Sequence, residues 1–170
     1  NNGGNDYSII GITANQSVAV DKALGDYAND WGYYKGGSNS LLRNNNGTTS
    51  WGTPYNAGDI VGVALDCTNN KLYFSKNGVW QESGNPSAGS GGISISAASS
   101  TPLGFYFPAC SYFDGTYHGR FKANFGNGFF GTTAITTNSG NGYAGAENAS
   151  KFYYPVPTNY SALNTKGLNQ

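Results

Sequence analysis

Apolar and polar residues alternate along several short stretches of the chain, and this period-two pattern predicts β-strands. The run 60–66 is apolar almost throughout, so it is expected to be covered on both faces of its sheet. No stretch has the length and periodicity of an amphipathic helix, although one helical turn is expected within 18–24. The pattern therefore predicts an all-β protein, with strands at 7–13, 31–35, 60–66, 71–76, 103–110 and 120–125.

Turn-forming residues separate these strands. The polar stretch 67–70 joins two of them into a β-hairpin, and Asn77-Gly78 ends the second strand of that hairpin. Pro108 marks an edge strand or a bulge, because proline has no N–H to donate to a neighbouring strand. Longer polar stretches are expected to be loops, at 14–30, 36–50, 81–92 and 138–149.

The composition is neutral and poor in charge. Nine acidic and nine basic residues give a formal net charge of zero, and only 11% of residues are charged. The bases are scattered, so no basic patch for nucleic acid is expected. No stretch approaches the roughly 20 apolar residues of a membrane span. Asn, Ser and Thr must therefore keep the surface polar, as suits an extracellular environment.

Residues that could carry chemistry are few. Cys67 and Cys110 are expected to be buried free thiols, although a disulfide between them stays open. His118 is the only histidine and follows a polar turn without a nucleophile motif, so a surface loop position is favoured. The best cluster of calcium-type ligands lacks EF-hand spacing and is favoured as solvated loop residues: Asp21, Asp26, Asn29 and Asp30. We expect no enzyme activity, no metal and no cofactor.

Several motifs in order resemble the SPRY domain family. Residues 58–66 (GDIVGVALD) and 72–78 (LYFSKNG) are similar to the family's signature hairpin, and 124–126 (NFG) to its closing motif. Further similar motifs are Phe107-Pro108-Ala109, Trp31-Gly32-Tyr33 and Trp51-Gly52. The resemblance covers roughly residues 7–130 and implies a bent two-sheet antiparallel β-sandwich, a concanavalin-like jelly roll.

The resemblance also suggests a domain division. Residues 1–135 are expected to form the SPRY-like sandwich, and 136–170 a loop followed by an extended, proline-containing strap or linker. The family has a strand before the segment that matches 7–13, and no such strand precedes it here. We therefore expect 7–13 to present an unpaired edge that another segment or chain completes. Gly58 and Asp59 are expected to serve the scaffold.

SPRY domains bind partners with loops at one end of the sandwich, and this implies a surface built from 14–30, 36–50, 77–92 and 111–119. Aromatic residues in strands are expected in the core: Trp31, Tyr33, Trp51, Tyr73 and Phe125. The candidate ligand-binding residues are those in the loops: Tyr27, Trp80, Tyr112, Phe113, Tyr117 and His118.

The tail adds a narrower resemblance. Residues 154–165 (YPVPTNYSALNT) are similar to a segment that follows SPRY-like domains in bacteriophage structural proteins. This implies a non-catalytic binding module of a phage or virus particle (tail, fibre or decoration), located in the virion or outside cells. Its expected partners are a host-surface glycan, another protein or other chains of the particle. Two alternatives stay open: a SPRY adaptor that binds a short peptide, and a purely structural assembly module.

Overall fold

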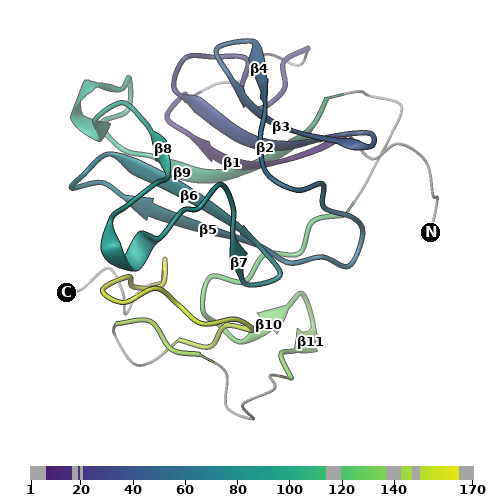
Figure 1. Cartoon of the computed structure of the whole chain (residues 1–170), viewed down its shortest axis with the longest axis vertical. Coiled ribbons are helices and arrows are strands. Elements are labelled where there is room, and N and C mark those ends of the chain that lie inside the picture. The colour runs from purple at the N-terminus through teal and green to yellow at the C-terminus, as the bar shows by residue number, and fades with distance from the viewer. Residues whose placement is uncertain are drawn as a thin grey trace. The chain divides into compact units, whose positions relative to one another are not determined.

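A computed structural model describes residues 7–16, 19, 21–113, 120–136, 143–146 and 150–164 (Figure 1). The chain forms two compact units. The first contains residues 1–84 and 91–119, and the second contains 85–90 and 120–170. Residues 120–170 thus belong to the second unit, and the division expected after residue 135 stays a prediction. The described residues contain no helix with the length and apolar character needed to cross a bilayer.

The first sheet of the first unit is antiparallel, with strand order β4-β3-β2-β1-β9. The central strand β1 has a partner on each side, since Ile10 pairs with Tyr33 of β2 and with Cys110 of β9. The prediction of an unpaired edge at 7–13 is therefore wrong. The strands are β1 (Ser8–Thr13), β2 (Asp30–Gly36), β3 (Asn39–Asn44), β4 (Gly47–Ser50) and β9 (Phe107–Tyr112).

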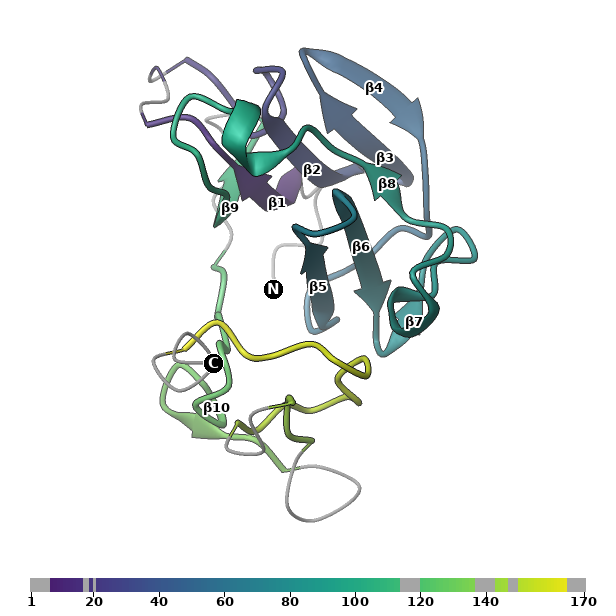
Figure 2. The same cartoon turned by 90° about the vertical axis from the view of Figure 1, so that its left-hand side faces the viewer.

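The second sheet is built around β6, which pairs with β5 along one edge and with β7 and β8 along the other. Figures 1 and 2 show β5 and β6 side by side below the first sheet. Because β5 lies at the sheet edge and Val63 is 41% exposed, the expectation that this strand is covered on both faces is wrong. The strands are β5 (Val61–Asp66), β6 (Lys71–Lys76), β7 (Val79–Trp80) and β8 (Ile93–Ser94); a 3₁₀ turn, η2 (Ala98–Ser100), follows.

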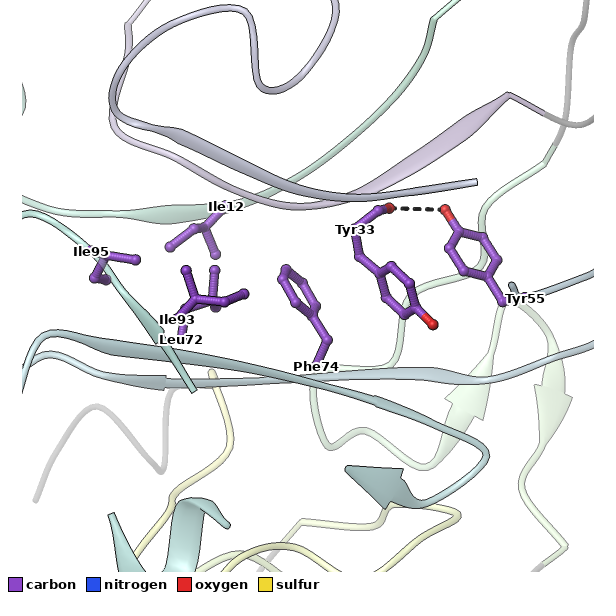
Figure 3. Close-up of a cluster of buried hydrophobic side chains, with 7 residues drawn as sticks. All are labelled: Ile12, Tyr33, Tyr55, Leu72, Phe74, Ile93 and Ile95. Atoms are coloured by element: carbon purple, nitrogen blue, oxygen red, sulfur yellow. Dashed lines mark hydrogen bonds between the residues drawn. The ribbon is translucent and has the colours of Figure 1, made fainter. Parts of the chain in front are cut away.

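A hydrophobic core fills the space between the two sheets (Figure 3). Alternation along β6 sends Leu72 and Phe74 into this core, and Tyr73 to the opposite face of its sheet. Each fully buried side chain of this size contributes about 1.5–3 kcal/mol. The cluster consists of Ile12, Tyr33, Tyr55, Leu72, Phe74, Ile93 and Ile95.

The aromatic residues predicted for the core divide into three groups. Tyr33 and Tyr73 are buried, as predicted. Trp31 and Trp51 are partly buried and pack against the core from its margin. Phe125 belongs to the second unit and is 45% exposed, so its core assignment is wrong. The alternation of apolar and polar residues around Phe125 does not show whether another part of the protein packs over its side chain.

The polar stretch 36–50 is a β-hairpin, not the loop that was predicted. Asn45 and Asn46 have φ angles of 50° and 59° and form a two-residue turn between the paired residues Asn44 and Gly47. Two successive left-handed residues are typical of the type I′ turn, whose twist matches that of the flanking strands. The alternation of apolar and polar residues did not predict this hairpin, because β4 is exposed along its whole length.

Other local predictions are confirmed. The hairpin turn 67–70 contains Asn70 at φ 54°, and Asn77-Gly78 turns with φ angles of 49° and 81°. Pro108 lies in β9, an edge strand. Cys67 and Cys110 are free, as predicted, but both are exposed and not buried. The helical turn expected within 18–24 falls partly outside the described residues, and 21–24 contain no helix.

The second unit holds a short hairpin of β10 (Phe129–Phe130) and β11 (Thr133–Ala134). Residues 120–125 form no strand, so the strand predicted there is wrong. Within this unit, isolated bridges join Asn127 to Lys151 and Tyr143 to Phe152. The following residues, 153–164, contain no strand. The strap expected within 136–170 stays a prediction. The backbone N–H of Thr158 donates to Ser87 Oγ (3.0 Å), in the 3₁₀ turn η1 (Pro86–Ala88).

Candidate functional site

A second apolar cluster lies on the outer face of the first sheet, away from the core. The strand registers place Ile9 opposite Tyr34, and Tyr34 opposite Leu41, so these three side chains share one face. The segment 21–28 crosses this face and contributes Ala23 and Leu24 to the cluster. Ile9 and Tyr34 are thereby almost completely buried, although they point away from the sandwich core.

Specific hydrogen bonds fix the segment 21–28. Leu24 N–H donates to Ser111 Oγ (2.9 Å), and Asn46 N–H donates to the carbonyl of Gly25 (2.9 Å). Gly25 has φ +96°, and a Cβ atom at this position would lie 2.5 Å from Cγ of Arg43. A residue without a side chain is therefore required where the segment passes over Arg43.

Asp26 and Arg43 form a buried ion pair beneath this segment. Their side chains are only 10% and 7% exposed, and the Arg43 guanidinium donates to Asp26 Oδ1 and to Asn46 Oδ1 (3.2 Å). Burial alone would raise the pKa of Asp26, but hydrogen bonds from Ala23 N–H and Arg43, with the charge of Arg43, lower the pKa below its ordinary value. The pair is thus held in its charged form.

Phe113 packs against the Arg43 side of this ion pair. The Arg43 guanidinium carbon lies 4.6 Å from the centre of the Phe113 ring, in cation–π geometry. The centres of the Tyr34 and Phe113 rings are 5.5 Å apart, and those of the Tyr34 and Tyr7 rings are 6.4 Å apart. Phe113 is nevertheless 49% exposed. We call Tyr7, Asp26, Tyr34, Arg43 and Phe113 the outer-face cluster.

The outer-face cluster offers a rigid apolar contact with little net charge. Asp26 and Arg43 neutralise one another, and Phe113 presents the exposed half of its ring on a fixed support. Aromatic and arginine side chains in such settings are enriched among the residues that dominate protein–protein binding energy. The cluster is suited to binding a complementary surface.

The structure separates the candidate residues that the sequence grouped. Phe113 belongs to the outer-face cluster, and Tyr27 adjoins it, since its carbonyl accepts from Asn45 N–H (3.2 Å). Tyr112 pairs with Ser8 and faces the other side of the first sheet. Trp80 lies on the second sheet, against the Tyr73 ring at 6.4 Å. Tyr117 and His118 lie outside the described residues.

The four loops implied by the resemblance do not meet at one end of the sandwich. Thr13 pairs with Phe107 at one end of the first sheet, and Ser8 pairs with Tyr112 at the other. The chain therefore leaves the first sheet after Thr13 at one end and after Tyr112 at the other. The segment 21–28 reaches Phe113 only because it folds back over the outer face.

Sequence reasoning missed Arg43, Tyr34 and Tyr7, and treated Asp26 only as a loop acid. The sequence does contain a feature that could have placed Arg43 on the outer face. It stands two residues after Leu41, and alternate residues of a strand lie on the same face. That signal depends on reading 39–44 as a strand. No sequence pattern indicates that Asp26 crosses the sheet to meet Arg43.

The acids that were favoured as solvated loop residues over calcium ligands have different surroundings. Asp26 binds Arg43, and Asp21 is exposed. The fully buried Asp30 accepts hydrogen bonds at Oδ1 from Thr13 (2.5 Å) and Asn15 (2.6 Å). The described residues contain no group of three or more His, Cys, Asp or Glu side chains arranged to hold a metal.

Asp59 has the scaffold role that was predicted. Its carboxylate accepts from Asn56 N–H (2.8 Å) and Asn77 Nδ2 (2.7 Å), and Lys76 Nζ lies 3.4 Å away. Burial raises the pKa of Asp59, but these hydrogen bonds and the Lys76 charge outweigh it and lower the pKa overall. Asp59 thus fastens the entry of β5 to the turn that follows β6.

Comparison with known proteins agrees with this architecture. The family model of the SPRY domain matches residues 3–126. A Ran-binding proteins 9/10 homologue of Drosophila melanogaster is 34% identical over 77 residues, which are 45% of this chain and 8% of the fly protein. The dual specificity protein kinase splA of Dictyostelium discoideum is 33% identical over 79 residues, 46% of this chain and 3% of the kinase. The chain thus spans less than a tenth of either relative, and on the family match it belongs to the SPRY domain family.

Proposed function

We propose that this SPRY domain is a non-catalytic module that binds a protein partner through the outer-face cluster. The observation that carries the proposal is Phe113, which is 49% exposed although Arg43 and Tyr34 hold its ring in place. Binding costs less when the contacting side chain is already ordered, because no rotamer freedom is lost on association. A half-exposed aromatic ring on a fixed support is such a side chain.

Family membership supports the same reading. SPRY domains are generally protein-interaction modules without catalytic activity, and the fly relative carries a Ran-binding protein name. That name applies to the fly protein, of which 8% is matched. We take from it only the class of partner, a protein, and not its identity.

The setting that we propose is a virus or phage particle, or another extracellular location. Two features support it: only 11% of residues are charged, and 154–165 resemble a segment of phage structural proteins. In that setting the protein partner is a neighbouring chain of the particle or a protein of the host surface. A host-surface glycan is the alternative that the experiment must separate from a protein.

The test compares two exposed phenylalanines of the same unit. Phe113 is 49% exposed and Phe105 is 54% exposed, so Phe113→Ala and Phe105→Ala remove similar surfaces. Each variant is applied to immobilised particle proteins, to bacterial cells of the source environment before and after protease treatment, and to a glycan array. We expect Phe113→Ala to weaken saturable, protease-sensitive binding about tenfold or more, with Phe105→Ala unchanged.

Three results would overturn the proposal. Equal effects of the two variants would remove the outer-face cluster as the site. Loss of binding in Trp80→Ala but not in Phe113→Ala would move the site to the second sheet. Binding that survives protease treatment and appears on the glycan array would make the ligand a carbohydrate.

A further inference from the structure

The free edge of β5 is a second surface of the first unit. β5 pairs with β6 along one edge only, and among the described residues of the first unit no backbone hydrogen bond reaches its other edge. Asn77 N–H donates to the Ile60 carbonyl (2.8 Å), so alternate residues from Ile60 onward bond to β6. The N–H and C=O groups of Val61, Val63 and Leu65 therefore point away from the sheet.

The other sheet edges of the first unit are protected against pairing with another chain. Phe113 N–H donates to the Tyr7 carbonyl, so every second residue of β9 counted from Phe113 bonds to β1. The backbone groups of the residues between them point away from β1, and one of these residues is Pro108, which has no N–H. β4 has four residues, all exposed and polar or glycine, and β7 and β8 have two residues each. Proline, short length and polarity are the ordinary protections of an edge strand.

β5 has none of these protections. Residues 60–65 (IVGVAL) contain no proline and no charge. Val63 is 41% exposed although it shares a face with the core residue Phe74. On β9 of the first sheet, Pro108 and Cys110 are also exposed, although they pair with the inward-facing residues of β1. Apolar side chains on the inner faces of both sheets are thus partly exposed.

Acidic residues stand at both ends of this edge. Asp59 precedes β5 and is paired with Lys76. Asp66 ends β5, and no lysine or arginine of the described residues lies within ion-pair distance of it. Hydrogen bonds from the Asn69 side chain and from the N–H groups of Asn69 and Thr68 lower the pKa of Asp66, so it is negatively charged at neutral pH.

We propose that the free edge of β5 binds an extended peptide of another protein, which adds a strand to the second sheet. Its apolar side chains, at alternate positions, cover Val63, and a lysine or arginine at its end contacts Asp66. Backbone hydrogen bonds supply the affinity in this mode of recognition, and alternate side chains supply the specificity. The site is separate from the outer-face cluster and does not rest on its function.

A second copy of this chain fits the edge less well. Antiparallel pairing of two β5 strands centred on Val63 places Asp66 of each copy opposite the uncharged Ile60 of the other, so this pairing gives Asp66 no basic partner across the strands. A peptide with a lysine or arginine at its end supplies that partner.

Amide hydrogen exchange, measured by NMR on the full chain, tests the edge itself. In the free protein we expect fast exchange at Val61, Val63 and Leu65, and slow exchange at Gly62 and Ala64, which bond to β6. The probe is the synthetic peptide KVTVTVK, with a fluorescent label for anisotropy. Its addition should slow exchange at the three outward amides, and the charge-reversed peptide EVTVTVE should have no effect.

A matched set of variants tests the binding. Val63→Pro removes one outward N–H and no bond to β6, so it should weaken KVTVTVK binding about tenfold or more while Gly62 and Ala64 stay protected. Val63→Lys should act in the same direction, and Val79→Lys, at a 66% exposed valine of the same sheet, should not. Phe113→Ala should leave peptide binding unchanged, which separates this test from that of the outer-face cluster.

Several outcomes would overturn the inference. Slow exchange at Val63 in the dilute free protein would show that the chain itself already covers the edge. Protection that rises with protein concentration would show that a second copy covers it. Binding of KVTVTVK that Val63→Pro leaves unchanged would place the peptide elsewhere.

Discussion

At the scale of single residues, the Asp26–Arg43 pair should matter most for stability. Both side chains are at least 90% buried, so Arg43→Met leaves the Asp26 charge in the interior without its cationic partner. Breaking a buried pair in this way costs about 3–5 kcal/mol. We expect a loss of this size in the free energy of unfolding from urea denaturation near neutral pH.

The control for this prediction is the exposed pair of Lys22 and Asp21. Their charged groups are 4.0 Å apart and their side chains are 43% and 74% exposed. Exposed pairs contribute about 0–1 kcal/mol, so Lys22→Ala should leave the urea midpoint nearly unchanged. If Arg43→Met were equally mild, Asp26 would have another partner or access to water.

The acids with lowered pKa values predict how stability depends on pH. Asp26, Asp59 and Asp66 all have a folded-state pKa below the ordinary value of 3.8. A group of this kind binds protons less readily when folded, so its contribution is present above pH 3.8 and is lost as the pH falls through its folded pKa. The urea midpoint should therefore drop when the pH is lowered from neutral to about 3.

Asp59→Asn tests one part of that drop. The variant cannot titrate at this position, so its loss of stability between neutral and acidic pH should be smaller than that of the unmodified protein. It should be less stable than the unmodified protein near neutral pH, because the contact with Lys76 (3.4 Å) loses its charge. An unchanged pH profile would mean that Asp59 titrates alike in the folded and unfolded chain.

At the scale of elements, alanine substitution of two glycines distinguishes the cost of backbone strain from the cost of side-chain crowding. Gly25 and Gly58 have nearly equal φ angles, +96° and +94°. A Cβ on Gly58 would meet no atom within 4 Å, whereas on Gly25 it would lie 2.5 Å from Cγ of Arg43. Gly58→Ala should cost about 1–2 kcal/mol from the left-handed backbone alone. Gly25→Ala should cost about 1–3 kcal/mol more, because it also overpacks the outer-face cluster.

Thermal and urea unfolding of the two alanine variants give the comparison directly. Near-ultraviolet circular dichroism should change for Gly25→Ala, since moving Arg43 disturbs its contact with Phe113. The Gly58→Ala spectrum should match that of the unmodified protein. Equal costs for both variants would mean that the segment 21–28 shifts freely and does not fix Arg43.

Pattern analysis found the strands whose side chains alternate between core and exterior. β1, β2, β5 and β6 were predicted to within about two residues, because one face of each meets the core. The β3–β4 hairpin was missed because its outer strand is fully exposed and carries no apolar pattern. Residues 120–125 show the opposite case. Their apolar and polar residues alternate, yet they form no strand, because a strand also needs a partner strand to pair with.

At the scale of the whole molecule, the site was less predictable than the fold. Phe113 could be chosen from the sequence as an aromatic residue in a loop. Its support could not, since Asp26 and Arg43 meet only when a segment crosses a sheet. The same holds for the free edge of β5, because strand order and not strand sequence decides which strand ends a sheet.

The low charge of the whole chain predicts that its stability depends little on salt. Only 11% of residues are charged, and of the three ion pairs among the described residues one is buried and one is widely exposed. Salt screens exposed pairs, which contribute little here, and reaches buried pairs weakly. Raising NaCl from about 0.05 M to about 0.5 M should therefore change the free energy of unfolding by less than about 1 kcal/mol near neutral pH. A larger change would reveal a network of interacting charges beyond these three pairs, and Asp66→Asn would then show whether the unpaired acid at the end of β5 belongs to it.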